Sequence, residues 1–177
     1  VIISDMQISI RMIRTVGRLG RALEEEPKKH SVGALLSRHD DIGMMSRVLA
    51  ADLREAIEQG SLSLYYQPQI DADGGVIGVE SLLRWRHPEY GFIEPPVIVA
   101  LAEESGMSAR LEQWIMDTAL SRIRTMTENG VDGVTMSINA SALQLDGDLS
   151  GTLAAALKAH GVPAELVKVE ITEKDAL

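Results

Sequence analysis

The segment at residues 76–86 (VIGVESLLRWR) constrains the fold of this chain more than any other. If it is extended, successive side chains point to opposite faces, so Glu80, Leu82 and Arg84 share one face and mainly apolar residues share the other. A carboxylate and a guanidinium are costly to bury unless they are partnered. The plain interpretations are an antiparallel strand whose polar face meets water and a structural Glu80–Arg84 pair. The alternative is a strand that carries functional groups.

The same pattern recurs in two later segments, residues 134–141 (VTMSINAS) and 167–173 (VKVEITE). Each alternates an apolar row with a polar row, and the polar rows include Asn139 and Glu170. Helical patterns separate the three strands, which favours crossover connections and a parallel sheet. Glu80, Asn139 and Glu170 would then converge near the C-terminal ends of the strands, where barrel enzymes keep their chemistry. Such oxygen donors suit a hard cation, Mg²⁺, Mn²⁺ or Ca²⁺.

Short motifs follow one another in a fixed order from about Asp52 to the end of the chain. They are YQP at 66–68, ESLLRW at 80–85, HPEYG at 87–91, AEESG at 102–106, NAS at 139–141 and EITE at 170–173. The ordered set resembles the EAL domain, a family that hydrolyses the bacterial second messenger cyclic di-GMP. Residues 80–82 read ESL instead of EAL, which keeps the acidic residue and the leucine. The family's usual P-x-x-F-I-P reads PPVIVA at 95–100, without the aromatic residue and the second proline.

A further strand is expected at residues 61–71, directly before the Glu80 strand. The connection between the two is too short for a parallel crossover, so they are expected to pair antiparallel. This suits the EAL domain, whose barrel has one reversed strand. The predicted fold class is therefore α/β, a partial TIM-type (β/α) barrel with its first strand antiparallel, preceded by an N-terminal helical segment.

The resemblance implies a metal-dependent reaction. Glu80 and Glu170 would be catalytic and, together with Asn139, would bind Mg²⁺ or Mn²⁺, which polarises the phosphodiester and activates the attacking water. By resemblance the site also needs a D-D-F-G motif on the next strand and a Lys, a Glu and a Gln from later strands. The 177 residues contain no D-D-F-G motif. We therefore expect residues 46–177 to be the N-terminal half of an EAL domain and to be inactive alone.

The resemblance also implies contacts with the nucleotide. Arg84 would hold a phosphate oxygen, which suits its planar two-pronged donor, and Gln67 would bind a guanine edge. Glu173 lies on the opposite face from Glu170 and would anchor the loop after the next strand. Cyclic di-GMP would be cleaved to linear pGpG. A catalytically silent cyclic di-GMP receptor is the alternative, and a metal-dependent barrel enzyme of another substrate class is a third interpretation.

Residues 1–45 are interpreted as a helical signalling segment in front of this domain. An apolar stripe over residues 6–23 indicates a helix, and a second helix is expected over about 42–59. Residues 40–43 (DDIG) are close to the D-E-x-G of a HAMP relay; an ordinary linker helix is the alternative. In either case the stripe needs a partner, which favours a homodimer and an N-terminal sensory module in the parent protein.

The composition of the chain narrows the functions and locations that remain. A net charge of −9 argues against binding a nucleic-acid polymer through a basic surface. The absence of cysteine rules out disulfides and thiolate metal sites. No apolar run approaches the roughly 20 residues that span a bilayer. We expect a cytoplasmic location, and attachment of the parent protein to the inner membrane through a segment upstream of Val1 stays open.

Overall fold

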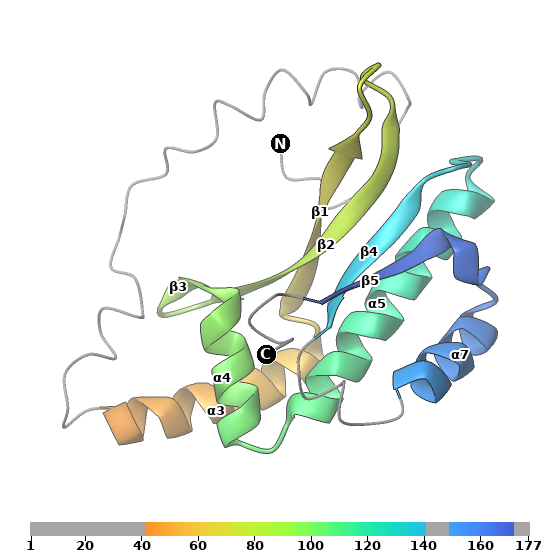
Figure 1. The fold of residues 1–177 in the computed structure, drawn as a ribbon. Helices are drawn as coiled ribbons and strands as arrows, with labels where there is room; N and C mark the ends of the chain where they lie inside the picture. Colours follow the sequence, from red (N-terminus) through yellow and green to blue (C-terminus); the bar gives the residue numbers. More distant parts are fainter. Residues whose placement is uncertain (1–41, 141–148, 172–177) are drawn as a thin grey trace.

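A five-stranded sheet flanked by helices forms the described part of the chain, residues 42–140 and 149–171 of this computed structural model (Figure 1). The elements are, in order, α3 (Ile42–Gln59), β1 (Leu62–Ile70), β2 (Val76–His87), β3 (Gly91–Ile93), α4 (Pro95–Glu104), α5 (Ser108–Glu128), β4 (Thr135–Ala140), α7 (Leu149–His160), the 3₁₀ turn η1 (Ala164–Leu166) and β5 (Val167–Ile171). The expected helix at 6–23 and the motif at 40–41 lie outside the described residues. None of the described helices is both long enough and apolar enough to cross a membrane.

The strand order is β1-β2-β4-β5, with β3 paired to β2 at the side. β1 runs antiparallel to β2, whereas β2, β4 and β5 run parallel to one another. The lengths of the connections between the strands explain this pattern. A short turn at residues 71–75 can only fold the chain back beside itself, while α5 and α7 provide the crossovers that parallel strands require. The predicted partial barrel with a reversed first strand is confirmed.

The buried face of the sheet packs under helices. In β2 the side chains of Val79, Leu83 and Trp85 point to this face, and Trp85 is only 1% exposed. Met136 of β4 is fully buried on the same side, where α5 contacts β4 and β1. Burying each such side chain stabilises the fold by about 1.5–3 kcal/mol. The alternation predicted for these strands therefore separates core side chains from those on the opposite, more open face.

Helix α3 covers the end of the sheet near α4 (Figure 1). Its core residues Leu49 and Leu53 are fully buried, four positions apart on one stripe. The helix ends before Gly60, which has a φ of 76°. Glycine reaches this left-handed conformation without the steric cost that a Cβ brings, so it terminates the helix cleanly.

A buried histidine joins α3 to the end of β2. His87 is 5% exposed, and its Nε2 lies 3.0 Å from Oδ2 of Asp52 on α3. Its Nδ1 accepts hydrogen bonds from the backbone N–H groups of Glu89 and Tyr90, at 3.1 and 3.2 Å. Because Nδ1 is an acceptor, Nε2 carries the proton and donates it to Asp52. This arrangement fixes the β2–β3 turn against the first helix of the domain.

Candidate active site

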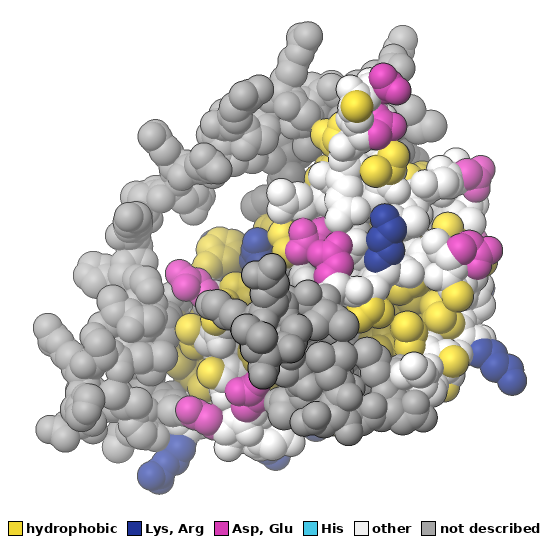
Figure 2. Space-filling view, in the orientation of Figure 1, with side chains coloured by type: hydrophobic (Ala, Val, Ile, Leu, Met, Phe, Trp, Pro, Cys, Tyr) yellow, Lys and Arg dark blue, Asp and Glu magenta, His cyan; other side chains and the backbone are white. Residues whose placement is uncertain are grey.

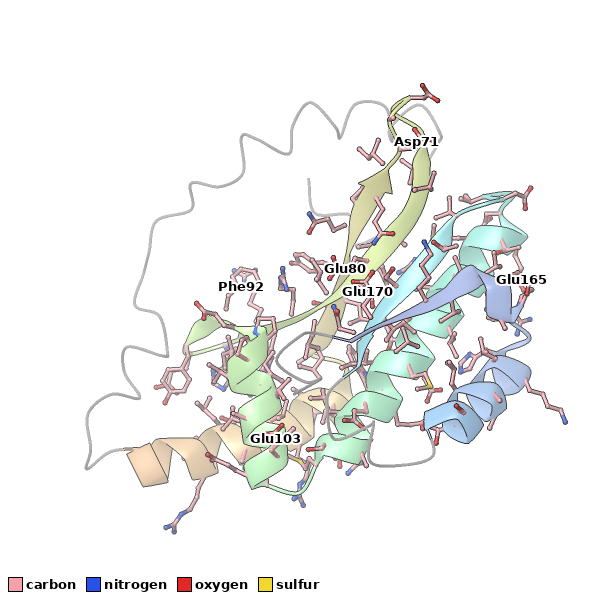
Figure 3. The ribbon with its side chains drawn as sticks, viewed as in Figure 1. Asp71, Glu80, Phe92, Glu103, Glu165 and Glu170 are labelled. Atoms are coloured by element: carbon pink, nitrogen blue, oxygen red, sulfur yellow. The ribbon has the colours of Figure 1, made fainter. Side chains whose placement is uncertain are left out.

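The open face of the sheet carries the polar side chains that the sequence singled out. Directly opposed residues of neighbouring strands project to the same face. One such row runs across all four main strands and consists of Gln67, Glu80, Ser137 and Lys168. In the next row Asn139 of β4 is opposite Glu170 of β5. In Figure 2 acidic side chains gather at the centre of this face, and Figure 3 shows Glu80 and Glu170 projecting from it.

Glu80 and Asn139 are in direct contact. The Asn139 amide nitrogen donates to Oε1 of Glu80 at 3.0 Å. Glu80 is half-buried and Asn139 is exposed. The expectation that Glu80 would be near the C-terminal end of its strand is wrong, because β2 continues for seven residues beyond it, to His87, in order to pair with β3. In the strand register Glu80 is opposite Ser137, which lies three residues before the end of β4.

Glu170 has a partner that the sequence analysis missed. Nε2 of Gln69 donates to Oε1 of Glu170 at 3.3 Å and lies 3.4 Å from Oγ of Ser137. The available signal was parity, because Gln69 lies two residues after Gln67 and so faces the same side of β1. Alternation alone does not show which residues on the other strands it reaches.

Arg84 is half-buried on the same face of β2. Its Nη1 donates to the backbone oxygen of Leu83 at 2.7 Å, and its guanidinium carbon lies 5.7 Å from the centre of the Tyr65 ring. Within the described part of the chain, Arg84 forms no ion pair with Glu80. The interpretation of these two residues as a structural salt bridge is therefore wrong, and the guanidinium is held by an aromatic ring instead.

Of the two remaining predicted site residues, Gln67 and Glu173, only Gln67 lies in the described part of the chain. Gln67 is exposed on β1, directly opposite Glu80. Glu173 lies outside the described residues, so its expected loop-anchoring role stays a prediction. Gln67 can therefore meet a ligand that lies on Glu80, and among the described residues its side chain has no hydrogen bond or ion pair that would order it beforehand.

The donor set fits a hard cation. Glu80 and Glu170 supply carboxylate oxygens, and Asn139 can present its amide oxygen by a rotation of its side-chain amide. Oxygen ligands of this kind suit Mg²⁺ or Mn²⁺ better than softer metals. In the described residues, no three His, Cys, Asp or Glu side chains form a metal-binding cluster. These three side chains would provide part of a coordination shell, which water or a phosphate oxygen would complete.

Residues 50–177 match the family profile of the EAL domain. The chain belongs to the EAL domain family. This confirms the family that the ordered motifs, among them ESL at residues 80–82, indicated. The reversed first strand and the parallel strands that follow are the architecture expected of an EAL domain.

Relatives of this EAL domain include proteins named for cyclic di-GMP chemistry. It is 37% identical over 131 residues to the bifunctional diguanylate cyclase/cyclic di-GMP phosphodiesterase MucR of Pseudomonas aeruginosa, covering 73% of this chain and 19% of MucR. It is 35% identical over 128 residues to the cyclic di-GMP phosphodiesterase NbdA of the same species, covering 71% of this chain and 16% of NbdA. The chain thus spans less than a fifth of the length of either relative.

A solved structure shows the same fold. The MucR phosphodiesterase in complex with cyclic di-GMP superposes with a TM-score of 0.69 at 36% identity, over 73% of this chain and 53% of that chain. The fold described above is therefore that of a known EAL domain, and the matched part of this chain covers about half of that structure.

Proposed function

We propose that this EAL domain hydrolyses cyclic di-GMP to linear pGpG in a reaction that requires Mg²⁺ or Mn²⁺. The observation that carries the proposal is the convergence of Glu80, Asn139 and Glu170 on one open face, with Asn139 in contact with Glu80 at 3.0 Å. The relatives named above and the cyclic di-GMP complex of MucR support the choice of substrate.

Glu80, Glu170 and the amide oxygen of Asn139 would hold the cation. When bound, a divalent cation polarises a phosphoryl oxygen and lowers the pKa of its water ligand. The chain's own contribution is to fix these donors on adjacent strands, so that their oxygens need little reorganisation. The ladder pairing of Asn139 with Glu170 and the hydrogen bond from Asn139 to Glu80 provide this fixation.

Arg84 would bind a non-bridging phosphate oxygen of the dinucleotide. Its guanidinium is held by the Tyr65 ring, and a planar guanidinium forms strong charge-assisted hydrogen bonds with phosphate. Gln67, exposed opposite Glu80, would reach a guanine edge. These contacts bind and orient the substrate, whereas Glu80, Asn139 and Glu170 on the same face carry the chemistry.

The finer assignments belong to the same proposal. Two-metal catalysis needs ligands that hold both ions about 3.5–4 Å apart. Glu80, Asn139 and Glu170 provide for one such ion, so we propose that residues 1–177 assayed alone turn over cyclic di-GMP poorly. In the complete protein we propose a cytoplasmic homodimer that an N-terminal sensory segment regulates.

The test is turnover by the complete protein with Mg²⁺ or Mn²⁺, with pGpG measured as product. Glu80→Ala should lower kcat by more than about 100-fold, because loss of a ligand exceeds the 10- to 100-fold cost of losing an outer partner. Arg84→Ala should mainly raise KM, by about 10- to 100-fold, since hydrogen bonds to charged groups contribute about 1.5–3 kcal/mol. Arg86→Ala, which removes an exposed arginine two residues away, is the matched control and should behave as the unaltered protein.

Two outcomes contradict the proposal. Full activity of Glu80→Ala would remove the metal-ligand role, provided that its circular dichroism spectrum is unchanged. Tight binding of cyclic di-GMP without turnover by the unaltered complete protein would favour a receptor.

A further inference from the structure

Gln69 and Glu170 meet although they come from the two ends of the main strand order. β1 and β5 are separated by β2 and β4. With neighbouring strands about 4.8 Å apart, three steps amount to about 14 Å along the sheet. Nevertheless Nε2 of Gln69 lies 3.3 Å from Oε1 of Glu170. The contact therefore depends on the curvature of the sheet and on two long side chains extended toward each other across its concave face.

A glycine opens the path for this contact. Gly78 of β2 is the ladder partner of Gln69. A Cβ at Gly78 would lie 2.7 Å from Oε1 of Gln69 and 2.8 Å from Oγ1 of Thr135, closer than carbon atoms approach such groups. Gly78 is not among the glycines with positive φ. Its lack of a side chain therefore matters for space and not for backbone conformation, and Gln69 and Thr135 share that space.

The Gln69 amide engages only one oxygen of Glu170. It donates to Oε1, and its second neighbour is the hydroxyl of Ser137, a residue that is completely buried. Among the described residues, Glu170 has no other side-chain donor. Within that part of the chain Oε2 is therefore available to a ligand, while the hydrogen bond to Oε1 restrains the carboxylate from rotating away.

We propose that Gln69 is a positioning residue for Glu170, an inference that rests on the proposed function. Gln69 holds Oε1 so that the carboxylate stays on the face shared with Glu80 and Asn139 and presents Oε2 to a divalent cation. Partners of metal ligands fix ligand orientation, and their loss typically weakens metal affinity or activity by about 10- to 100-fold. Without Gln69, the Glu170 side chain would rotate more freely, so cation binding would have to offset the entropic cost of ordering it.

The test is Mn²⁺ binding to the complete protein without nucleotide, measured by isothermal titration calorimetry. Gln69→Met keeps the length of the side chain but removes its N–H donors, and Gln69→Leu is a second apolar variant in case one packs poorly. Both should weaken Mn²⁺ binding by about tenfold. Gln59→Met is the matched control, because Gln59 donates to Glu55 at 2.7 Å in an exposed amide–carboxylate pair on α3. This control should bind Mn²⁺ as the unaltered protein does.

A second background shows whether Gln69 acts through Glu170. Glu170→Asp keeps a carboxylate but withdraws it by about one C–C bond, about 1.5 Å, beyond the reach of an amide now at 3.3 Å. In that background Gln69→Met should change Mn²⁺ affinity by less than about twofold, because coupled residues are not additive. An equal loss in both backgrounds would show that Gln69 only supports the fold and would overturn the inference.

The outcomes separate this inference from the proposed reaction. Unchanged Mn²⁺ affinity in both Gln69 variants, at unchanged melting temperature, overturns the positioning role and leaves hydrolysis intact. Weakened Mn²⁺ binding in a protein that does not cleave cyclic di-GMP supports the positioning role and removes the proposed reaction. Failure of the unaltered protein to bind Mn²⁺ overturns both.

Discussion

Asn139 donates its side-chain amide to Glu80 across two parallel strands, with Nδ2 and Oε1 3.0 Å apart. This hydrogen bond joins two groups that face the same open surface. An amide has one donor end and one acceptor end, so a half-turn of the Asn139 side-chain amide exchanges the N–H for an oxygen that a cation can bind. Asn139 can thus donate its N–H to the carboxylate, as it does here, or present an oxygen that would join that carboxylate in binding a cation.

Asn139→Asp should make the stability of the domain depend on cations. It places a second carboxylate near Glu80, and two like charges about 4 Å apart repel by about 1 kcal/mol where water screens them. Without added metal the Tm should fall by about 2–4 °C for each kcal/mol in a chain of this size. Mn²⁺ should raise the Tm of the variant by more than it raises that of the unaltered protein, as followed by circular dichroism.

Gln113→Glu is the matched control for that substitution. Gln113 donates to Oδ2 of Asp117 at 3.0 Å on the exposed face of α5, away from the site. The change creates the same pairing of like charges without a convergent ligand set. It should lower the Tm slightly and show no additional response to Mn²⁺, and a response equal to that of Asn139→Asp would contradict a specific cation site.

Gly78→Ala should destabilise the domain and displace Gln69. Its new Cβ would lie 2.7 Å from Oε1 of Gln69, and crowding of this kind typically costs about 1–3 kcal/mol. In a Gln69→Ala background the shorter side chain removes that clash and leaves only the one with Thr135, so the cost of Gly78→Ala should shrink. Urea unfolding of the four proteins gives the coupling directly, and strictly additive losses would show that Gln69 does not fill the space above Gly78.

Alternation in the sequence was enough to predict which face each strand residue occupies. It placed Glu80 and Arg84 on one face, and it placed Asn139 and Glu170 on the polar faces of two later strands, because side-chain direction in an extended chain depends only on local geometry. It also predicted the reversed first strand, since a five-residue turn permits no crossover.

The contacts between strands could not be predicted in the same way. Gln69 reaches Glu170 over three strand spacings, which depends on sheet curvature and on the gap at Gly78. The position of Glu80 within β2 depends on the pairing of that strand with β3 (Gly91–Ile93), a short strand with little alternation of its own. In both cases the deciding partner is distant in sequence, so no local pattern contains the information.

Asp52→Ala should destabilise the domain more than Asp117→Ala. Both aspartates bind a histidine Nε2, Asp52 to His87 at 3.0 Å and Asp117 to His160 at 2.9 Å. His87 is 5% exposed and His160 is 24% exposed, so water can replace the lost partner more readily at His160. An unpaired buried donor costs about 1–3 kcal/mol.

Thermal unfolding of the complete protein measures the difference. Because a loss of 1 kcal/mol corresponds to about 2–4 °C here, Asp52→Ala should lower the Tm by about 2–12 °C and Asp117→Ala by less than about 2 °C. Equal shifts would show that burial of His87 does not make its hydrogen bond to α3 more important than a surface pair.

Tyr65→Leu should weaken substrate binding without changing the chemical step. The Tyr65 ring lies under the Arg84 guanidinium, whose carbon is 5.7 Å from the ring centre. At partly exposed sites such cation–π contacts contribute about 0.5–1 kcal/mol, which corresponds to a rise in KM of about two- to fivefold. Tyr65→Phe keeps the ring face and should retain the original KM.

Phe92→Leu is the matched control. It removes an equivalent ring 5.9 Å from Arg86, an arginine without a proposed role, and so controls for the loss of a surface aromatic. A fall in kcat at constant KM in Tyr65→Leu would contradict the assignment of Arg84 to substrate binding, because it would place the ring's effect on the reaction itself.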